Sequence, residues 1–126
     1  MPFEPNHLSP LALAFLGDTV FDLLVRERLL LEANRPPGKL HRAATALVNC
    51  RAQAACCEAL FPLLTEAEAD TLRRGKNAKP GHVPAHQTRE DYAKATAVEA
   101  LFGWLWLRGE FERARELFAV CAKCGE

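Results

Sequence analysis

The sequence predicts an all-α fold. Apolar residues recur at helical spacing along most of the 126 residues, strand-type alternation is absent, and Ser, Thr, Pro and Gly bound the periodic segments. Hydrophobic residues make up 49% of the chain, enough to bury a core, and we expect one domain over residues 1–126. No apolar run approaches the roughly 20 residues of a membrane-spanning helix, and the N-terminus lacks a signal-peptide pattern. We therefore expect a cytoplasmic protein with no membrane contact.

Five helices are expected. The first begins at Ser9, an N-cap followed by Pro10, and runs to about residue 31, before the turn at residues 34–38. A second long helix spans about residues 39–61, with one apolar stripe that includes Phe61. A capping box at residues 65–68 opens a short third helix, which Gly75 closes.

The segment 76–87 contains two prolines and a glycine and is expected to be a loop. Thr88 caps the fourth helix, which runs to Arg108 and ends at Gly109. The last helix covers about residues 110–122. Its expected inward-facing residues are Phe111, Ala114, Phe118 and Cys121.

The five cysteines are expected to be free thiols, since an odd count in a cytosolic chain of this size does not indicate disulfides. Cys50, Cys56 and Cys57 fit as small apolar residues of a helix. Cys121 and Cys124 have a spacing that zinc and redox sites use, without a second such pair. A helical interaction domain stapled by zinc at these two residues is the lowest-ranked alternative.

Positive charge is concentrated in one segment. The formal net charge is zero, yet residues 1–72 carry a net −3, residues 73–94 a net +4 and residues 95–126 a net −1. Segregated charge of this kind gives a neutral protein a local anion-binding face. A merely solvated loop is the alternative.

Two carboxylates interrupt apolar helix faces. Asp18 lies among apolar neighbours in the first helix, and Glu99 does so in the fourth. A buried carboxylate is costly unless it is paired or metal-bound, so we expect the two helices to pack together and share Mg²⁺, with Mn²⁺ as the alternative. The other interpretation places both residues at the edge of the apolar stripe, in water. Gly17 costs about 1 kcal/mol inside a helix, which indicates close approach of another helix or of a dimer mate.

Three ordered motifs carry a family resemblance. Residues 13–20, LAFLGDTV, resemble the FLGD signature of ribonuclease III domains, and residues 98–103, VEALFG, resemble a second motif of that fold. Between them, residues 73–79, RRGKNAK, are similar to the basic segment of the Mini-ribonuclease III subfamily, which lacks a double-stranded-RNA-binding domain. The dipeptides at 40–41 and 53–54 match that subfamily too. The resemblance extends over about residues 8–107 and implies a ribonuclease III endonuclease domain that forms a homodimer.

The resemblance also implies a reaction. Members of this family use a metal ion to cleave double-stranded RNA, best known in the maturation of precursor large-subunit (23S) ribosomal RNA. Water attacks in line and leaves 5′-phosphate and 3′-hydroxyl ends. Carried onto this chain, Asp18 and Glu99 are the catalytic residues and the Mg²⁺ ligands. A ribosomal protein is a further candidate partner.

The remaining site residues follow from the same resemblance. Those expected to bind RNA are Arg73, Arg74, Lys76, Asn77, Lys79, His82, His86 and Arg89. For Arg73 and Arg74, complementing the helix dipole is an equally weighted alternative. Phe15 and Leu16 are expected at the dimer interface, with ordinary core as the alternative for Phe15.

The chain departs from full-length ribonuclease III at two positions. Ala14 and Thr96 stand where those enzymes carry Glu and Asp, as in Mini-ribonuclease III. This simplification leaves open the number of metal ions. It also leaves an alternative function, a catalytically silent module that binds ribosomal RNA. Asp22 is kept out of the catalytic set.

Overall fold

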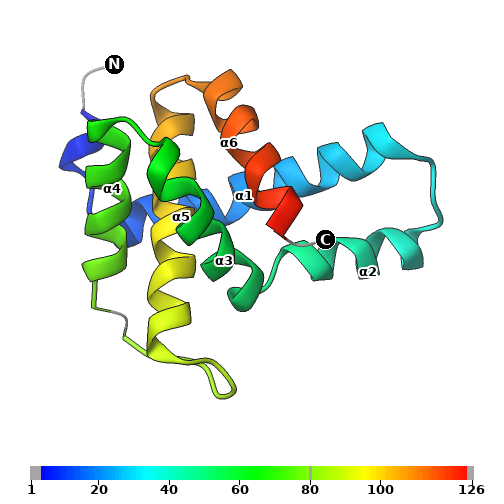
Figure 1. Cartoon of the computed structure of the whole chain (residues 1–126), viewed down its shortest axis with the longest axis horizontal. Coiled ribbons are helices and arrows are strands. Elements are labelled where there is room, and N and C mark those ends of the chain that lie inside the picture. The colour runs from blue at the N-terminus through cyan, green and yellow to red at the C-terminus, as the bar shows by residue number, and fades with distance from the viewer. Residues whose placement is uncertain (1–3, 80, 125–126) are drawn as a thin grey trace.

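Helix α5, Arg89–Leu107, is the central element of the fold, and α1, α3 and α4 pack around it (Figure 1). The computed structural model describes residues 4–79 and 81–124, and within these ranges every regular element is helical, as predicted. The other elements are η1 (Pro5–His7), α1 (Pro10–Glu32), α2 (Pro37–Leu47), α3 (Cys50–Leu60), η2 (Phe61–Leu63), α4 (Glu66–Asn77) and α6 (Phe111–Cys124). No helix within the described ranges is long and apolar enough to cross a membrane.

The core lies where α5 meets α1, α3 and α6. Almost every residue of α5 from Ala95 to Leu105 is buried. Phe21 of α1 packs edge-on against Phe102 of α5 at 5.6 Å and against Phe118 of α6 at 5.3 Å between ring centroids. These aromatic contacts hold α1 and α6 on α5.

Three predicted helix starts are confirmed by their caps. The Ser9 hydroxyl accepts a hydrogen bond from the backbone N–H of Ala12 at 3.1 Å. The Thr88 hydroxyl accepts one from Asp91 at 3.0 Å. At the start of α4 the complete capping box of Thr65 and Glu68 is present. These starts depend on local chemistry alone, which explains why the sequence locates them.

The second predicted helix is wrong as one element, because it is divided into α2 and α3. Asn49 has an extended backbone, with φ −150° and ψ 157°. Its side-chain oxygen accepts from Ala52 N at 2.9 Å, and its amide donates to Thr45 O at 3.0 Å. One asparagine thus ends α2 and caps α3. Phe61 falls in η2 and is half exposed instead of continuing an apolar stripe.

Two further details differ from the sequence prediction. Gly75 does not end α4, which continues to Asn77. A β-carbon at Gly75 would lie 2.9 Å from the Ala97 Cα, so this glycine permits close packing of α4 on α5. Phe111 is partly exposed rather than inward-facing, with its ring 4.5 Å from that of Trp106. Lys76 and Asn77 therefore lie on the last turn of a helix and not in a loop.

The five cysteines are free thiols, as predicted. Cys56 and Cys57 are buried in α3, and Cys121 is buried in α6. The Cys56 thiol donates to the Cys121 carbonyl oxygen at 3.3 Å. Cys56 and Cys121 therefore pack as small core residues between α3 and α6, and Cys57 is a further small core residue of α3.

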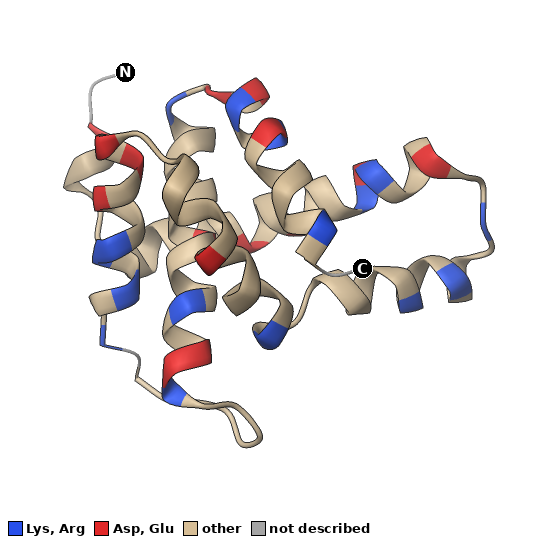
Figure 2. Ribbon diagram, in the orientation of Figure 1, with Lys and Arg blue, Asp and Glu red and all other residues tan. Residues whose placement is uncertain are grey.

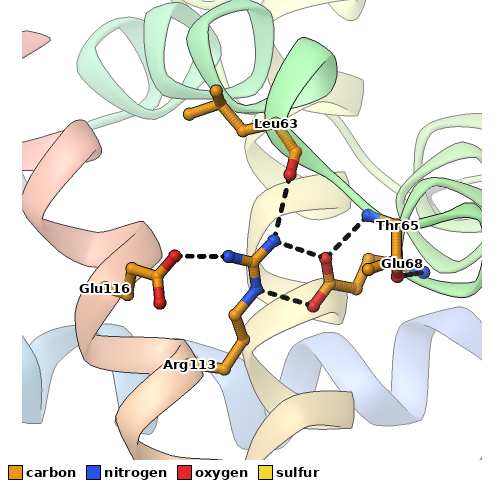
Figure 3. A network of polar contacts seen from close by, with 5 residues as sticks. All are labelled: Leu63, Thr65, Glu68, Arg113 and Glu116. Carbon is orange, nitrogen blue, oxygen red and sulfur yellow. Dashed lines mark hydrogen bonds and ion pairs between the residues drawn. The ribbon is translucent and has the colours of Figure 1, made fainter.

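A buried ion pair fastens α4 to α6 (Figure 3). The Arg113 guanidinium donates to both carboxylate oxygens of Glu68, from Nε at 2.9 Å and from Nη2 at 2.8 Å. It also donates to the Leu63 carbonyl oxygen at 3.0 Å and to Glu116 at 2.6 Å. Glu68 is only 3% exposed, so the fork-shaped pairing neutralises a charge taken out of water. The pair holds the base of α4, the helix whose other end carries the basic residues.

Removing this arginine tests the role of the pair. We expect Arg113→Met to lower the free energy of unfolding by about 3 kcal/mol, because Glu68 is left buried without a counter-charge. The guanidinium holds the pKa of Glu68 below its ordinary value of 4.5. The stabilisation is therefore complete above that pH and is lost as the pH falls through the lowered pKa. Urea unfolding at neutral pH and in steps below 4.5 measures both effects.

The matched control is Glu116→Gln, which removes only the exposed partner of the same guanidinium. We expect a loss below about 1 kcal/mol. An equal loss in the two variants would contradict a special role for Glu68.

Candidate active site

Two glycines bring α1 and α5 into backbone contact. A β-carbon at Gly17 would lie only 1.6 Å from the backbone carbonyl oxygen of Glu99. A β-carbon at Gly103, one turn further along α5, would lie 2.0 Å from the carbonyl oxygen of Leu13. Only residues without a side chain allow the helices to cross at this separation. The close approach predicted for Gly17 is thus confirmed, with α5 as the approaching helix.

The crossing places the two predicted carboxylates together. Asp18 directly follows Gly17, and Glu99 lies opposite on α5. Burial raises the pKa of Glu99 to about 8, and a hydrogen bond with Asp18 and its negative charge add to the effect. Asp18 itself is exposed, so the apolar surroundings predicted for both residues hold only for Glu99. The pair has one carboxyl turned to solvent and one largely withdrawn from it.

The chemistry of this pair fits a hard divalent cation. Two adjacent ionised carboxylates repel each other unless a cation is bound between them. Among the described residues, no group of three or more His, Cys, Asp or Glu side chains is arranged to hold a metal ion. Mg²⁺ commonly binds through one or two carboxylates while keeping several waters and taking up substrate phosphate oxygens. The donor set therefore suits a hard, partly hydrated divalent cation better than a closed structural metal site.

Ala14 and Thr96, where full-length ribonuclease III has two further carboxylates, have structural roles in this chain. Ala14 is buried in the core, and the Thr96 hydroxyl donates to the Tyr92 carbonyl oxygen at 2.9 Å within α5. Asp22, one turn after Asp18, pairs with Arg26 at 3.2 Å. None of the three belongs to the facing pair.

Sequence reasoning gave no role to Gln53, a buried neighbour of the site. Gln53 lies on α3 and its amide lowers the pKa of Glu99 as a hydrogen-bonding neighbour. Its Nε2 atom is nevertheless buried without a partner at hydrogen-bond geometry among the described residues. The available signals were the match of residues 53–54 to the subfamily and a polar residue between Ala52 and Ala54 on the buried face of α3.

Most of the predicted RNA-binding residues gather at one end of the molecule, around the end of α4, the following loop and the start of α5 (Figure 2). The exposed members are Arg73, Lys76, Asn77, Lys79, His82, His86 and Arg89. Arg74 differs, because it is half-buried and its guanidinium donates to the Leu8 carbonyl oxygen at 3.2 Å. Arg74 therefore has a structural contact within the chain, between α4 and the segment before α1.

The loop of this basic end has a constrained backbone at one position. His86 has a φ of 73°, in the left-handed region that residues other than glycine seldom adopt.

Lys94, further along α5, is less available to bind an anion than the exposed basic residues. Its ammonium is paired with Glu58 and lies 3.2 Å from Glu90.

Phe15 lies on the surface of α1 and is 84% exposed, which excludes the alternative of ordinary core. Leu11, one turn earlier, is 44% exposed, and Leu16 is half-buried. This apolar surface adjoins the carboxylate pair along the same helix.

The sequence profile of the ribonuclease III domain matches residues 11–110 of this all-helical chain. Proteins named Mini-ribonuclease 3 are 44% identical in Symbiobacterium thermophilum (94% of this chain, 92% of the relative) and 41% identical in Thermoanaerobacter (90% and 80%). The chain belongs to the Mini-ribonuclease 3 family and is an endoribonuclease of the ribonuclease III type.

A solved structure confirms the fold. A crystal structure of a Fusobacterium nucleatum protein superposes with a TM-score of 0.81 at 29% identity and covers 93% of each chain. A ribonuclease III domain implies double-stranded RNA as the substrate.

Proposed function

We propose that this protein hydrolyses double-stranded RNA at a divalent metal site formed by Asp18 and Glu99, and that its substrate is a stem of precursor 23S ribosomal RNA. The observation that carries this function is the facing carboxylate pair at the Gly17 crossing. A structural module would gain nothing from keeping two carboxyls in contact, because each destabilises the other.

The chain's own residues prepare the reaction. Asp18 and Glu99 would hold Mg²⁺, with Mn²⁺ as a substitute, and the cation supplies neutralisation of the scissile phosphate and a more acidic water. The Gly17 crossing fixes the separation of the two helix backbones that carry these side chains. In the hydrolysis, water adds to phosphorus and the P–O3′ bond breaks. The products are a 3′-hydroxyl end and a 5′-phosphate end.

The basic end of the molecule supports binding of an A-form duplex. Such a duplex is recognised through phosphates and 2′-hydroxyls across its shallow minor groove. Lys76 and Lys79 provide cations, while the Asn77 amide can both donate to and accept from a 2′-hydroxyl. All three side chains are exposed.

We expect Lys76→Ala combined with Lys79→Ala to weaken duplex binding at low salt. Each lost phosphate contact removes about one unit from the slope of log K against log salt, so the double variant should lose about two. Filter binding across a salt series measures the slope. Lys123→Ala, an exposed lysine on α6, is the matched control and should keep the wild-type slope. A double variant with the wild-type slope would show that the two lysines do not contact phosphate.

The exposed apolar surface of α1 supports a homodimer. A two-fold axis through this surface would present two carboxylate pairs to the two strands of a duplex. We expect Phe15→Glu to produce monomers, because it places a charge in the interface where Phe15 buries its ring. Sedimentation of the wild type and the variant measures the oligomeric state. A wild type that is monomeric at micromolar concentration would contradict the dimer.

A labelled duplex incubated with Mg²⁺ or with EDTA tests the function. Cutting that requires Mg²⁺ supports the proposal, and a precursor 23S stem should be cut at fewer positions than a random duplex. Binding without cutting, across stems that include the ribosomal precursor, would favour the silent RNA-binding module. Adding a large-subunit ribosomal protein to the same reactions tests whether the substrate must first be reshaped.

A further inference from the structure

We propose that Gln53 is a positioning residue for the metal site, and that its side-chain amide orients the Glu99 carboxylate toward Asp18. The proposal rests on the proposed metal site at Asp18 and Glu99. It concerns a third helix, α3, which contributes no acidic ligand.

The placement of Gln53 is the first argument. Its side chain is 5% exposed and belongs to the face of α3 that packs on α5. Its Nε2 atom is the one buried side-chain nitrogen or oxygen in the described part of the chain that lacks a hydrogen-bond partner. An unpaired buried N–H group costs about 1–3 kcal/mol, which methionine at this position would avoid. The amide is therefore costly for packing alone.

The location of Glu99 supplies the partner. Gln53 is a hydrogen-bonding neighbour of the Glu99 carboxyl, and its buried Nε2 atom has no other partner among the described residues. A carboxylate has two oxygens, and if one faces Asp18 and the cation, the other needs a donor from the protein side.

Support of this kind has a measurable consequence. Carboxylates that bind metal ions are commonly held by hydrogen bonds from a surrounding layer of residues, and removing such a bond weakens metal affinity or activity by about 10- to 100-fold. We expect Gln53→Met to raise the half-saturating Mn²⁺ concentration by this factor. Its melting temperature without metal should be unchanged or higher, because the unpaired N–H is gone.

The test uses Mn²⁺ as the probe and needs no RNA. Free Mn²⁺ is followed by electron paramagnetic resonance in titrations of the wild type, Gln53→Met and Gln87→Met. Gln87 is the other glutamine of the chain and is exposed, so its variant is the matched control. Wild-type Mn²⁺ affinity in Gln53→Met would overturn the proposal. A weaker affinity together with cleavage that excess Mg²⁺ restores would support it, since a packing defect alone would not respond to the metal concentration.

A second measurement avoids any variant that fails to fold. In the wild type labelled with ¹⁵N, Mg²⁺ should shift the side-chain amide resonances of Gln53 and slow their exchange with water, while those of Gln87 stay unchanged. Unaltered Gln53 resonances at saturating Mg²⁺ would overturn the proposal. If the wild type itself shows no Mn²⁺ binding that Asp18→Asn abolishes, the metal site fails and Gln53 loses its role with it. Binding at Asp18 without any effect of Gln53→Met rejects the role of Gln53 alone.

Discussion

Asp18→Asn is expected to lower the rate of duplex cleavage about a thousandfold. A divalent cation contributes several kcal/mol to stabilising charge in phosphoryl transfer, and each 1.4 kcal/mol of barrier corresponds to a tenfold change in rate. Asparagine keeps the shape of the side chain but removes the charge that would hold the cation with Glu99. Single-turnover cleavage with saturating enzyme measures the chemical step without interference from binding. Asp22→Asn, one turn further along α1, is the control and should stay within about threefold of the wild type.

The same substitution should stabilise the protein above pH 8 when no metal is present. The charge of Asp18 disfavours ionisation of Glu99, whose pKa is raised to about 8, so both carboxyls are ionised only above that pH. There, removing the Asp18 charge relieves the repulsion, so the melting temperature in EDTA should rise while activity disappears. At neutral pH Glu99 is protonated, and no such rise is expected. A loss of activity accompanied by a lower melting temperature would contradict this account, because it would indicate a folding defect. Wild-type cleavage in Asp18→Asn would place the reaction elsewhere.

Local chemistry made most of the helices predictable, and tertiary contacts determined the exceptions. Ser9, Thr65 and Thr88 act within one turn of themselves, so their effect is visible in the sequence. Asn49 also acts locally, but one residue that both ends a helix and caps the next is easily passed over inside an apolar periodic stretch. Gly75 was wrongly predicted to end its helix. A glycine is needed there because the α5 backbone packs against it, and that contact lies more than twenty positions away in the sequence.

The candidate site was predictable as two carboxylates on helices that pack together, but its detailed geometry was not. Asp18 and Glu99 interrupt apolar patterns on two helices, which predicted that these helices pack side by side. The glycine contacts between α1 and α5 explain how closely they do so. Gln53 belongs to the dipeptide at 53–54 that matches the subfamily, but neither that match nor a single polar residue in a helix indicated a role for it. Its significance comes from burial without a partner, and that requires coordinates.

Gly17→Ala should have the largest effect on stability, a loss of about 3 kcal/mol or more. The new β-carbon would lie 1.6 Å from the Glu99 carbonyl oxygen, so the α1 and α5 backbones must separate by more than an ångström. Backbone atoms of two packed helices cannot yield as a flexible side chain would, which puts this change at the upper end of overpacking. Urea unfolding measures the loss. The helix propensity of alanine works in the opposite direction and returns only about 1 kcal/mol.

Gly38→Ala separates the two effects. At Gly38 in α2 the nearest heavy atom to a new β-carbon is the end of the Arg42 side chain at 3.8 Å, so this variant should be as stable as the wild type or slightly more stable. Gly17→Ala should also lose cleavage by at least about a hundredfold under conditions where it is folded, because a displacement of about 1 Å is enough to misplace Glu99. Asp18→Asn and Gly17→Ala would then both be inactive, while their stabilities in EDTA above pH 8 change in opposite directions. The opposite stability changes distinguish a missing ligand charge from a displaced helix. Wild-type stability in Gly17→Ala would contradict the close contact of the α1 and α5 backbones.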